Sequence, residues 1–409
     1  MRLLDIVYEG WGEQWRIGRL AHDGQHLLFE YGKDAFDHGL ALSPNLPLQP
    51  GAFQGYGEHQ FGLPGAIADA LPDGWGLLVM DRLFRKCGKD PRRLSPLDRL
   101  AFIGDRGMGA LTFRPDEGMA LSTDDLSLLE LAAEVRQVVH DKDTAALPTL
   151  ARLGGSPQGA RPKALVNFNP ESGMVSTQAL PGGEPWLVKF QAGNEHPEVC
   201  AVETLYANLA EACGIEMPQT RLFELGAKLS AFGIKRFDRH AGMRVPTLTA
   251  AGAIDLNFRL PQMDYADLLR LTRALTRSQA EVNHAFRRAV FNVVFNNRDD
   301  HSKNVSYRLD RQGAWKLAPG YDLTFSDGPG GEHHMDVYGE ARHIGRALLL
   351  RLAAEHDVPT RLATGIIEQA CDVASGFAGA AADYPIRKAT RQGIAGRLKE
   401  NLARMGSDG

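Results

Sequence analysis

The sequence predicts an α+β fold with two lobes, in which a mixed N-terminal part of strands and helices precedes a mostly helical C-terminal lobe. A length of 409 residues with 44% hydrophobic composition is enough for two or three subdomains that each bury a core. Short alternating segments separated by glycine turns dominate the first part, whereas apolar residues recur at helical spacing in the last part. We place the boundaries at 1–120, 121–248 and 249–409.

The N-terminal subdomain is expected to begin with short strands. The segments RLLDIVY, WRIGRLAH and HLLFEYG are separated by glycine-rich turns, a pattern typical of strands. A helix is predicted to start near Leu77, after a turn that contains Asp73. Further along the chain, Ser122 with Asp124 and Asp125 is expected to cap the helix SLLELAAEVRQVV.

A glycine-rich stretch at residues 153–168, LGGSPQGARPKALVNF, is the first candidate for binding an anion. We expect a strand, then a turn around Gly155, Ser156 and Gly159, and then a second strand near Lys163. Glycines let backbone amides approach phosphate oxygens, and a lysine adds a point charge. A plain hairpin loop explains the same residues, so this stretch alone does not decide between the two interpretations.

A strand with a single lysine follows the glycine-rich stretch. Residues 185–190, PWLVKF, present Lys189 among apolar neighbours, as the phosphate-binding lysine of a kinase strand does. A helix is predicted from Pro197 to Cys213, with Gly214 as its C-terminal stop. Glu203 on this helix is a candidate ion-pair partner for Lys189, although a solvated glutamate is the alternative. Two further strands are expected to end at residues 235–239, KRFDR.

Polar residues are concentrated in the stretch 291–322, FNVVFNNRDDHSKNVSYRLDRQGAWKLAPGYD. Ser278 and Glu281 have the spacing of a capping box, which predicts a helix that stops near residues 296–297. A hairpin over residues 305–317 should then bring Asp299, Asn304 and Asp322 into one neighbourhood. An Asp followed five residues later by Asn, with another Asp beyond a strand pair, is typical of a kinase catalytic loop. A merely polar, solvated turn is the alternative.

Composition argues against several classes of function. A net charge of −4 and a pI near 6.4 do not favour an extensive nucleic-acid surface, which usually requires a basic face. The four cysteines form no CxxC pair and are expected to be thiols in a reducing cytoplasm. We expect no membrane-spanning segment and no signal peptide, since Asp5 and Glu9 interrupt the N-terminus.

Seven segments together carry a resemblance to a known family: ALPDGWG, AFIGDRGMGALTF, GARPKA, WLVKF, KRFDR, NNRDDHSKN and LAPGYDL. With these segments in this order, the sequence resembles the HipA family of bacterial serine/threonine kinases, the toxin half of HipBA-type toxin-antitoxin modules. The resemblance covers nearly the whole chain. It implies a kinase-like fold and ATP with Mg²⁺ as cofactors.

The resemblance also implies roles for individual residues. Asp299 would be the catalytic base, Asn304 and Asp322 the Mg²⁺ ligands, and Ser156 the site of autophosphorylation. Glu203 would support the phosphate-binding lysine through an ion pair. The residues expected to contact ATP are Gly155, Ser156, Gly159, Lys163, Lys189, Lys235, Arg236, Phe237, His301, Asn304, Tyr321 and Asp322. Asp300 receives no role, and His333 with His334 is expected to be a solvated loop pair.

The implied partners are proteins. A small helix-turn-helix antitoxin of the HipB type would bind this chain and supply the DNA contacts, and the substrate would be a translation protein such as an aminoacyl-tRNA synthetase. Three alternatives stay open at this point. They are a small-molecule or lipid-head-group kinase, a nucleotide-binding pseudokinase regulator, and a metal hydrolase that uses Asp299, Asp300 and His301.

Overall fold

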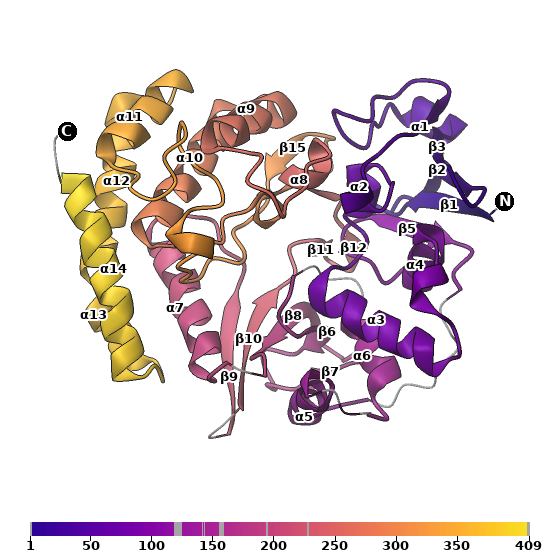
Figure 1. Ribbon diagram of the computed structural model, residues 1–409, viewed down its shortest axis with the longest axis horizontal. Coiled ribbons are helices and arrows are strands. Elements are labelled where there is room, and N and C mark those ends of the chain that lie inside the picture. The colour runs from indigo at the N-terminus through magenta and orange to yellow at the C-terminus, as the bar shows by residue number, and fades with distance from the viewer. Residues whose placement is uncertain are drawn as a thin grey trace. The chain divides into compact units, whose positions relative to one another are not determined.

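The computed structural model describes residues 2–117, 125–140, 142, 144–154, 159–193, 195–226 and 229–406. The chain forms two compact units, labelled by element in Figure 1. The first unit comprises Met1–Pro197, Arg221–Leu248 and Gly252–Asp255, and the second comprises Glu198–Thr220, Thr249–Ala251 and Leu256–Gly409. Strands dominate the first unit and helices the second, so the predicted α+β class is confirmed.

The first unit begins with a five-stranded sheet in the order β4-β3-β2-β1-β5. Its strands are β1 (Arg2–Tyr8), β2 (Trp15–His22), β3 (Leu27–Tyr31), β4 (Ala52–Phe53) and β5 (Leu111–Arg114). The three N-terminal strands expected from the alternating pattern are confirmed. Ile6, Ile17 and Phe29 are fully buried, because alternate side chains of each strand face the core.

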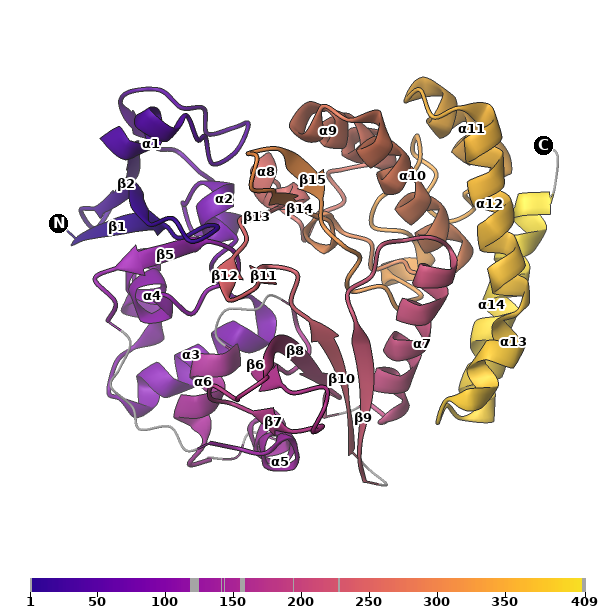
Figure 2. The ribbon, with the colours of Figure 1, turned by 180° about the vertical axis from the view of Figure 1, so that it is seen from behind.

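A second five-stranded sheet has the order β7-β6-β8-β10-β9 (Figure 2). Its strands are β6 (Lys163–Phe168), β7 (Val175–Ser176), β8 (Glu184–Phe190), β9 (Thr220–Gly226) and β10 (Leu229–Lys235). The expected lysine strand and the two strands before KRFDR are thereby confirmed. The short strands β11 (Arg239–His240) and β12 (Met243–Arg244) pair with each other, and β13 (Thr247–Thr249) follows them.

Six helices belong wholly to the first unit, as far as the structure describes it: α1 (Lys33–His38), α2 (Gly65–Ala68), α3 (Gly74–Lys86), α4 (Pro96–Ile103), α5 (Leu128–Val139) and α6 (Leu147–Gly154). The predicted cap of α5 is wrong. Ser127 caps the helix by accepting the Glu130 backbone N–H, whereas the Asp125 carboxylate accepts hydrogen bonds from Ser176 and Thr177. Ser122 and Asp124 lie outside the described residues.

The segment before the glycine-rich stretch is helical, so the predicted strand at this place is also wrong. α6 ends at Gly154, and its residues Leu147, Leu150 and Ala151 are buried at helical spacing. The glycine-rich stretch therefore joins a helix to β6 rather than a strand to a strand.

The second unit consists mostly of helices and contains a hairpin. Its helices are α7 (Glu198–Ala212), α9 (Tyr265–Thr276), α10 (Gln279–Val294), α11 (Arg346–Glu355), α12 (Thr360–Ser375), α13 (Phe377–Ala380) and α14 (Lys388–Gly406), while α8 (Ala250–Ala253) begins in this unit. The hairpin consists of β14 (Ser306–Leu309) and β15 (Trp315–Leu317), and α12 and α14 lie side by side (Figures 1 and 2). Phe286, Val290 and Phe291 of α10 are fully buried.

Short 3₁₀ turns complete the described elements: Glu58–Gln60, Pro91–Arg93, Ser302–Asn304, Pro329–Gly331 and Ala381–Asp383. Within the described parts of the chain, no helix is both long and apolar enough to span a bilayer.

One buried carboxylate joins the start of α7 to the start of α14. Glu198, whose side chain is 7% exposed, accepts hydrogen bonds from the Arg387 backbone N–H at 2.8 Å, from Arg387 Nε at 2.9 Å and from Thr390 Oγ1 at 2.8 Å. Burial alone would raise the pKa of Glu198, but these hydrogen bonds lower it to about 2.

We therefore expect Glu198→Gln to destabilise the protein in a pH-dependent way. A depressed pKa stabilises the fold above the unfolded value of about 4.3, and this contribution is lost as the pH falls toward the folded value. The substitution should lower the free energy of unfolding by about 2–3 kcal/mol at neutral pH, and by less at each lower pH. Urea unfolding of both proteins at several pH values would measure this. A difference that stays constant with pH would contradict the assignment.

Candidate functional site

The loop that carries Asp299 begins where α10 ends. Ser278 caps α10 by accepting the Glu281 backbone N–H at 3.4 Å, as the sequence predicts. The Glu281 carboxylate does not return to Ser278 but accepts the Leu317 backbone N–H at 2.9 Å, so only half of the expected capping box forms. The helix stops at Val294, and Asn296 has a left-handed φ of 55°. The predicted stop is thus confirmed.

The predicted hairpin follows this loop and leads the chain back to it. Strands β14 and β15 pair with Tyr307 opposite Leu317, and Gly313 takes the φ of +78° that the turn between them requires. Beyond the hairpin, the Ser326 backbone N–H donates to Asn296 O at 3.0 Å, and the Arg298 N–H donates to Ser326 O at 3.2 Å. The segment after Asp322 therefore runs beside the loop that contains Asp299.

Tyr321 ties the two segments together through its hydroxyl group. The hydroxyl donates to Lys303 O at 2.7 Å and lies 2.5 Å from Ser306 Oγ. The sequence resemblance predicts that Tyr321 contacts ATP, and this prediction stays untested. In the structure its hydroxyl is engaged within the loop, where it fixes the residue next to Asp322.

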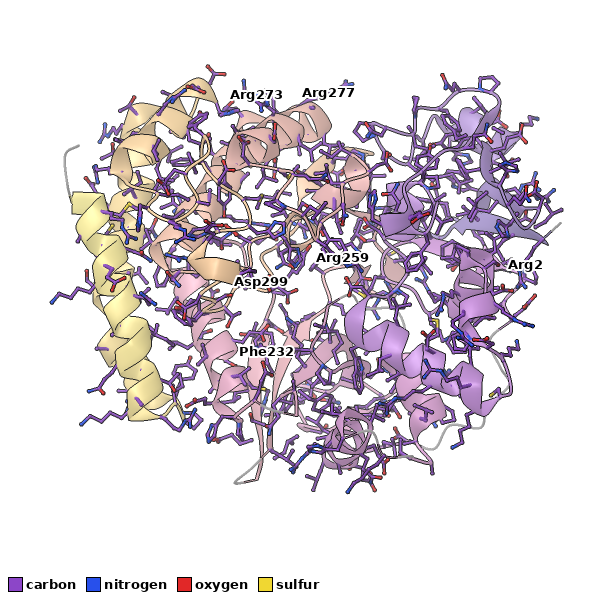
Figure 3. The ribbon with its side chains drawn as sticks, viewed as in Figure 1. Arg2, Phe232, Arg259, Arg273, Arg277 and Asp299 are labelled. Atoms are coloured by element: carbon purple, nitrogen blue, oxygen red, sulfur yellow. The ribbon has the colours of Figure 1, made fainter. Side chains whose placement is uncertain are left out.

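Asp299 lies in the loop after α10 (Figure 3), with 61% of its side chain exposed. Its carbonyl oxygen accepts a hydrogen bond from Asn304 Nδ2 at 2.7 Å, and its carboxylate lies 3.9 Å from His301 Nε2. Partial desolvation by the surrounding protein raises the pKa of Asp299; His301 opposes this rise and the charge of Asp322 reinforces it. A carboxylate with a raised pKa is a better general base near neutral pH.

The oxygen atoms near Asp299 suit a hard cation. The Asn304 amide nitrogen donates to Asp299 O, so the amide oxygen is the atom that can bind a cation. Asp322 adds a carboxylate. Amide and carboxylate oxygens are typical ligands of Mg²⁺, which usually binds one or two protein carboxylates and substrate phosphates. Among the described residues, no group of three or more His, Cys, Asp or Glu side chains could hold a metal ion by itself. The donor set fits a magnesium ion that a nucleotide helps to bind.

Asp300 is a buried anchor, which the sequence did not indicate. Its side chain is fully buried and accepts hydrogen bonds from the Tyr265 hydroxyl at 2.5 Å, from His333 Nδ1 at 2.8 Å and from the His334 backbone N–H at 2.7 Å. The expectation that His333 is solvated is wrong, because this residue is 6% exposed. His334 is half-buried and its ring packs edge-on against His301.

In the first unit, two predicted lysines face each other across neighbouring strands. Lys163 on β6 lies directly opposite Lys189 on β8, and Lys189 lies opposite Phe232 on β10, which Figure 3 labels. Lys163 is 3% exposed and Lys189 is 8% exposed. Two lysines on the same face of neighbouring strands make this place a candidate binding site for an anion.

Gly159 lies against Lys163. Gly159 has a φ of +105°, which glycine adopts without strain and other residues rarely adopt. A Cβ at this position would also collide with Lys163 Nζ. The Gly159 backbone N–H donates to the Asp73 carboxylate at the start of α3. Asp73 precedes α3 but does not cap it through its side chain, and its carboxylate instead holds the end of the glycine-rich stretch.

The predicted adenine-side residues have other partners in the structure. Lys235 Nζ lies 2.7 Å from Glu184 Oε1, and the Arg236 guanidinium donates to Asp238 at 2.9 and 2.8 Å. The Arg236 side chain is only 8% exposed. Phe237 lies between Arg236 and the buried Asp238 in the chain. The nucleotide roles of Lys235, Arg236 and Phe237 stay predictions.

The predictions for three further residues stay untested. Gly155 and Ser156 lie outside the described residues. Glu203 lies on α7, is 3% exposed and belongs to the second unit, whereas Lys189 belongs to the first. Their ion pair stays a prediction.

Known protein families and structures match nearly the whole chain. The model of the HipA-like C-terminal domain matches residues 155–376, and the model of the HipA N-terminal domain matches residues 8–114. The structure is similar to the HipA chain in the complex of Shewanella oneidensis MR-1 HipA, HipB and operator DNA, with a TM-score of 0.69, 20% identity, and coverage of 98% of this chain and 96% of that chain. It also matches the Helicobacter pylori proinflammatory kinase CtkA, with a TM-score of 0.39, 12% identity, and coverage of 54% of this chain and 88% of that chain. The first family model alone spans more than half of the 409 residues. The chain belongs to the HipA family.

Proposed function

We propose that this protein is an ATP- and Mg²⁺-dependent serine/threonine protein kinase that arrests growth as the toxin of a toxin-antitoxin pair. The observation that carries the proposal is the loop of the second unit, where Asp299, Asn304 and Asp322 follow the order of a kinase catalytic loop between α10 and the segment after the hairpin. Family membership supports the same assignment.

The chain's own residues divide the work in this reaction. The Asp299 carboxylate orients the acceptor hydroxyl and takes its proton, and its 61% exposure leaves it accessible to a protein substrate. Asn304 and Asp322 would hold Mg²⁺ through their oxygens, and the ion would neutralise part of the phosphate charge. Lys163 and Lys189 bind phosphate oxygens, with the backbone at Gly159 kept close to Lys163.

The lysine pair makes a testable contribution to ATP binding. We expect Lys189→Met to raise the KM for ATP about 10- to 100-fold, because a charge-assisted hydrogen bond contributes about 1.5–3 kcal/mol. Lys33→Met is a matched control, since Lys33 Nζ lies at the surface with 85% of the side chain exposed. Steady-state rates at varied ATP concentration would measure both variants. An unchanged KM in Lys189→Met would remove this residue from the phosphate site.

The finer parts of the proposal concern the phosphorylated proteins and the partner. From the family resemblance we propose that Ser156 is autophosphorylated. A phosphate on this loop would repel the nucleotide phosphates and so inactivate the enzyme. The family resemblance supplies an aminoacyl-tRNA synthetase as the first candidate substrate. The similar Shewanella structure contains HipB and operator DNA, which supports a HipB-type antitoxin as partner, with DNA contacted through it.

Labelled ATP tests the proposal. Incubation of the purified full chain with Mg²⁺, γ-labelled ATP and bacterial lysate should label the chain and at least one other protein. Ser156→Ala should remove label from the chain while the other protein stays labelled. Labelling of a metabolite without any labelled protein would instead support a small-molecule kinase, and ATP binding without turnover would support a pseudokinase.

A further inference from the structure

The residue after Asp299 is held far more firmly than Asp299 itself. Asp300 is 1% exposed, whereas the Asp299 side chain is 61% exposed. Besides the bonds from Tyr265, His333 and His334, the Met335 backbone N–H approaches the Asp300 carboxylate at 3.4 Å. Both carboxylate oxygens therefore have donors, which is the condition for burying a charged group without a large cost.

A chain of hydrogen bonds extends this anchor to the other end of the loop. The Tyr265 hydroxyl, which donates to Asp300, accepts from Asn292 Nδ2 at 3.0 Å. Asn292 Oδ1 in turn accepts from Asn297 Nδ2 at 2.9 Å. Tyr265, Asn292 and Asn297 are each at most 5% exposed. The residues that flank Asp299 on both sides are thus tied to α9 and α10.

We infer that Asp300, held by Tyr265 and His333, is a positioning residue that sets the direction of the Asp299 side chain. This inference rests on the proposed function. Successive residues share a peptide bond, so a fixed Asp300 leaves the Asp299 backbone little freedom. His333 comes from the segment after Asp322, and its bond to Asp300 also couples that segment to the loop. A displacement of about 1 Å in such a site lowers the rate about 100-fold.

The His333 contact can be changed without changing the size of the side chain greatly. Burial alone would raise the pKa of Asp300, but His333 and the hydrogen bonds to the carboxylate hold it below its ordinary value. The ionised carboxylate only accepts, so His333 Nδ1 carries the proton in this contact. An Asn side chain offers an N–H donor at a similar distance from the backbone, whereas Leu fills a similar volume without a donor.

The test compares His333→Leu with His333→Asn in the full chain. Phosphate transfer from labelled ATP is measured at saturating and at limiting ATP, and each rate is divided by the number of nucleotide-binding sites found by titration. We expect His333→Leu to lower the rate at saturating ATP about 10- to 100-fold and to change the half-saturating ATP concentration less than about threefold. His333→Asn should recover the rate to within about threefold of the original protein.

Tyr265→Phe gives a second, independent measurement, because it removes a single donor from Asp300. A smaller loss of about 3- to 10-fold is expected at saturating ATP. If the rates before division by the number of sites fall equally in His333→Leu and His333→Asn, and this fall matches the loss of binding sites, the contact is structural only. If both variants keep the full rate while Asp299→Asn is inactive, the positioning role is wrong and the kinase assignment stands. Full activity of Asp299→Asn would overturn both.

Discussion

Replacement of Asp299 by Asn should lower the rate of phosphate transfer about 100- to 10,000-fold, because a positioned general base contributes about this factor. The substitution keeps the shape of the side chain and the carbonyl oxygen that accepts from Asn304 Nδ2. Binding of Mg²⁺ with ATP should therefore change less than about threefold. Single-turnover transfer from labelled ATP and equilibrium nucleotide binding, measured on the same preparation, would separate the two effects.

Asp357→Asn is the matched control for this experiment. Asp357 belongs to the same unit, pairs with Arg273 at 2.6 Å, and has 73% of its side chain exposed. An exposed ion pair contributes about 0–1 kcal/mol to stability, so this variant should keep both binding and transfer. Transfer that survives in Asp299→Asn at the original rate would assign the base to another residue.

Much of the fold could be predicted from local patterns. Alternation with glycine turns located β1, β2 and β3, and the Ser278–Glu281 spacing located the start of α10. The prediction missed α14, although Ile394, Leu398 and Met405 are buried in it at intervals of four and seven residues. Few apolar residues mark this helix in a mostly polar segment, so tertiary packing decides its structure. The glycine-rich stretch is typical of a hairpin turn and so predicts a strand before it. That segment is α6 instead, and its buried residues follow a helical period.

The residues of the candidate site could be recognised in the sequence only where their signals are local. The separation of Asp299 from Asn304 is local, and a hairpin signal placed Asp322 near them. Asp300 could not be assigned, because its partners Tyr265 and His333 are 35 and 33 residues away in the sequence. Lys163 and Lys189 were each predicted to bind ATP, but their direct opposition depends on the register of β6 and β8. Long-range register and hydrogen bonds leave no periodic pattern in a single sequence.

Loss of the buried charge at Asp238 should be the most destabilising of the substitutions considered. Asp238 is fully buried and accepts hydrogen bonds from Arg236 Nη2 at 2.8 Å, from Arg239 Nη1 at 2.7 Å and from the Gly109 backbone N–H at 2.8 Å. Burial alone would raise the pKa of Asp238, but the two arginines hold it well below its ordinary value. Arg239 Nη2 also donates to Gly107 O at 3.1 Å, so this cluster joins the end of β10 to the segment before β5.

Asp238→Asn keeps the shape of the side chain but leaves two largely buried guanidinium groups without a balancing charge. Breaking a buried pair in this way costs about 3–5 kcal/mol. Glu117→Gln in the same unit is the control, because Glu117 pairs with Arg2 at 2.8 Å with 51% of its side chain exposed and should cost less than about 1 kcal/mol. Urea unfolding followed by circular dichroism measures both. Equal losses in the two variants would mean that the Asp238 cluster contributes no more than a surface ion pair, and that the first unit is held together by its apolar core alone.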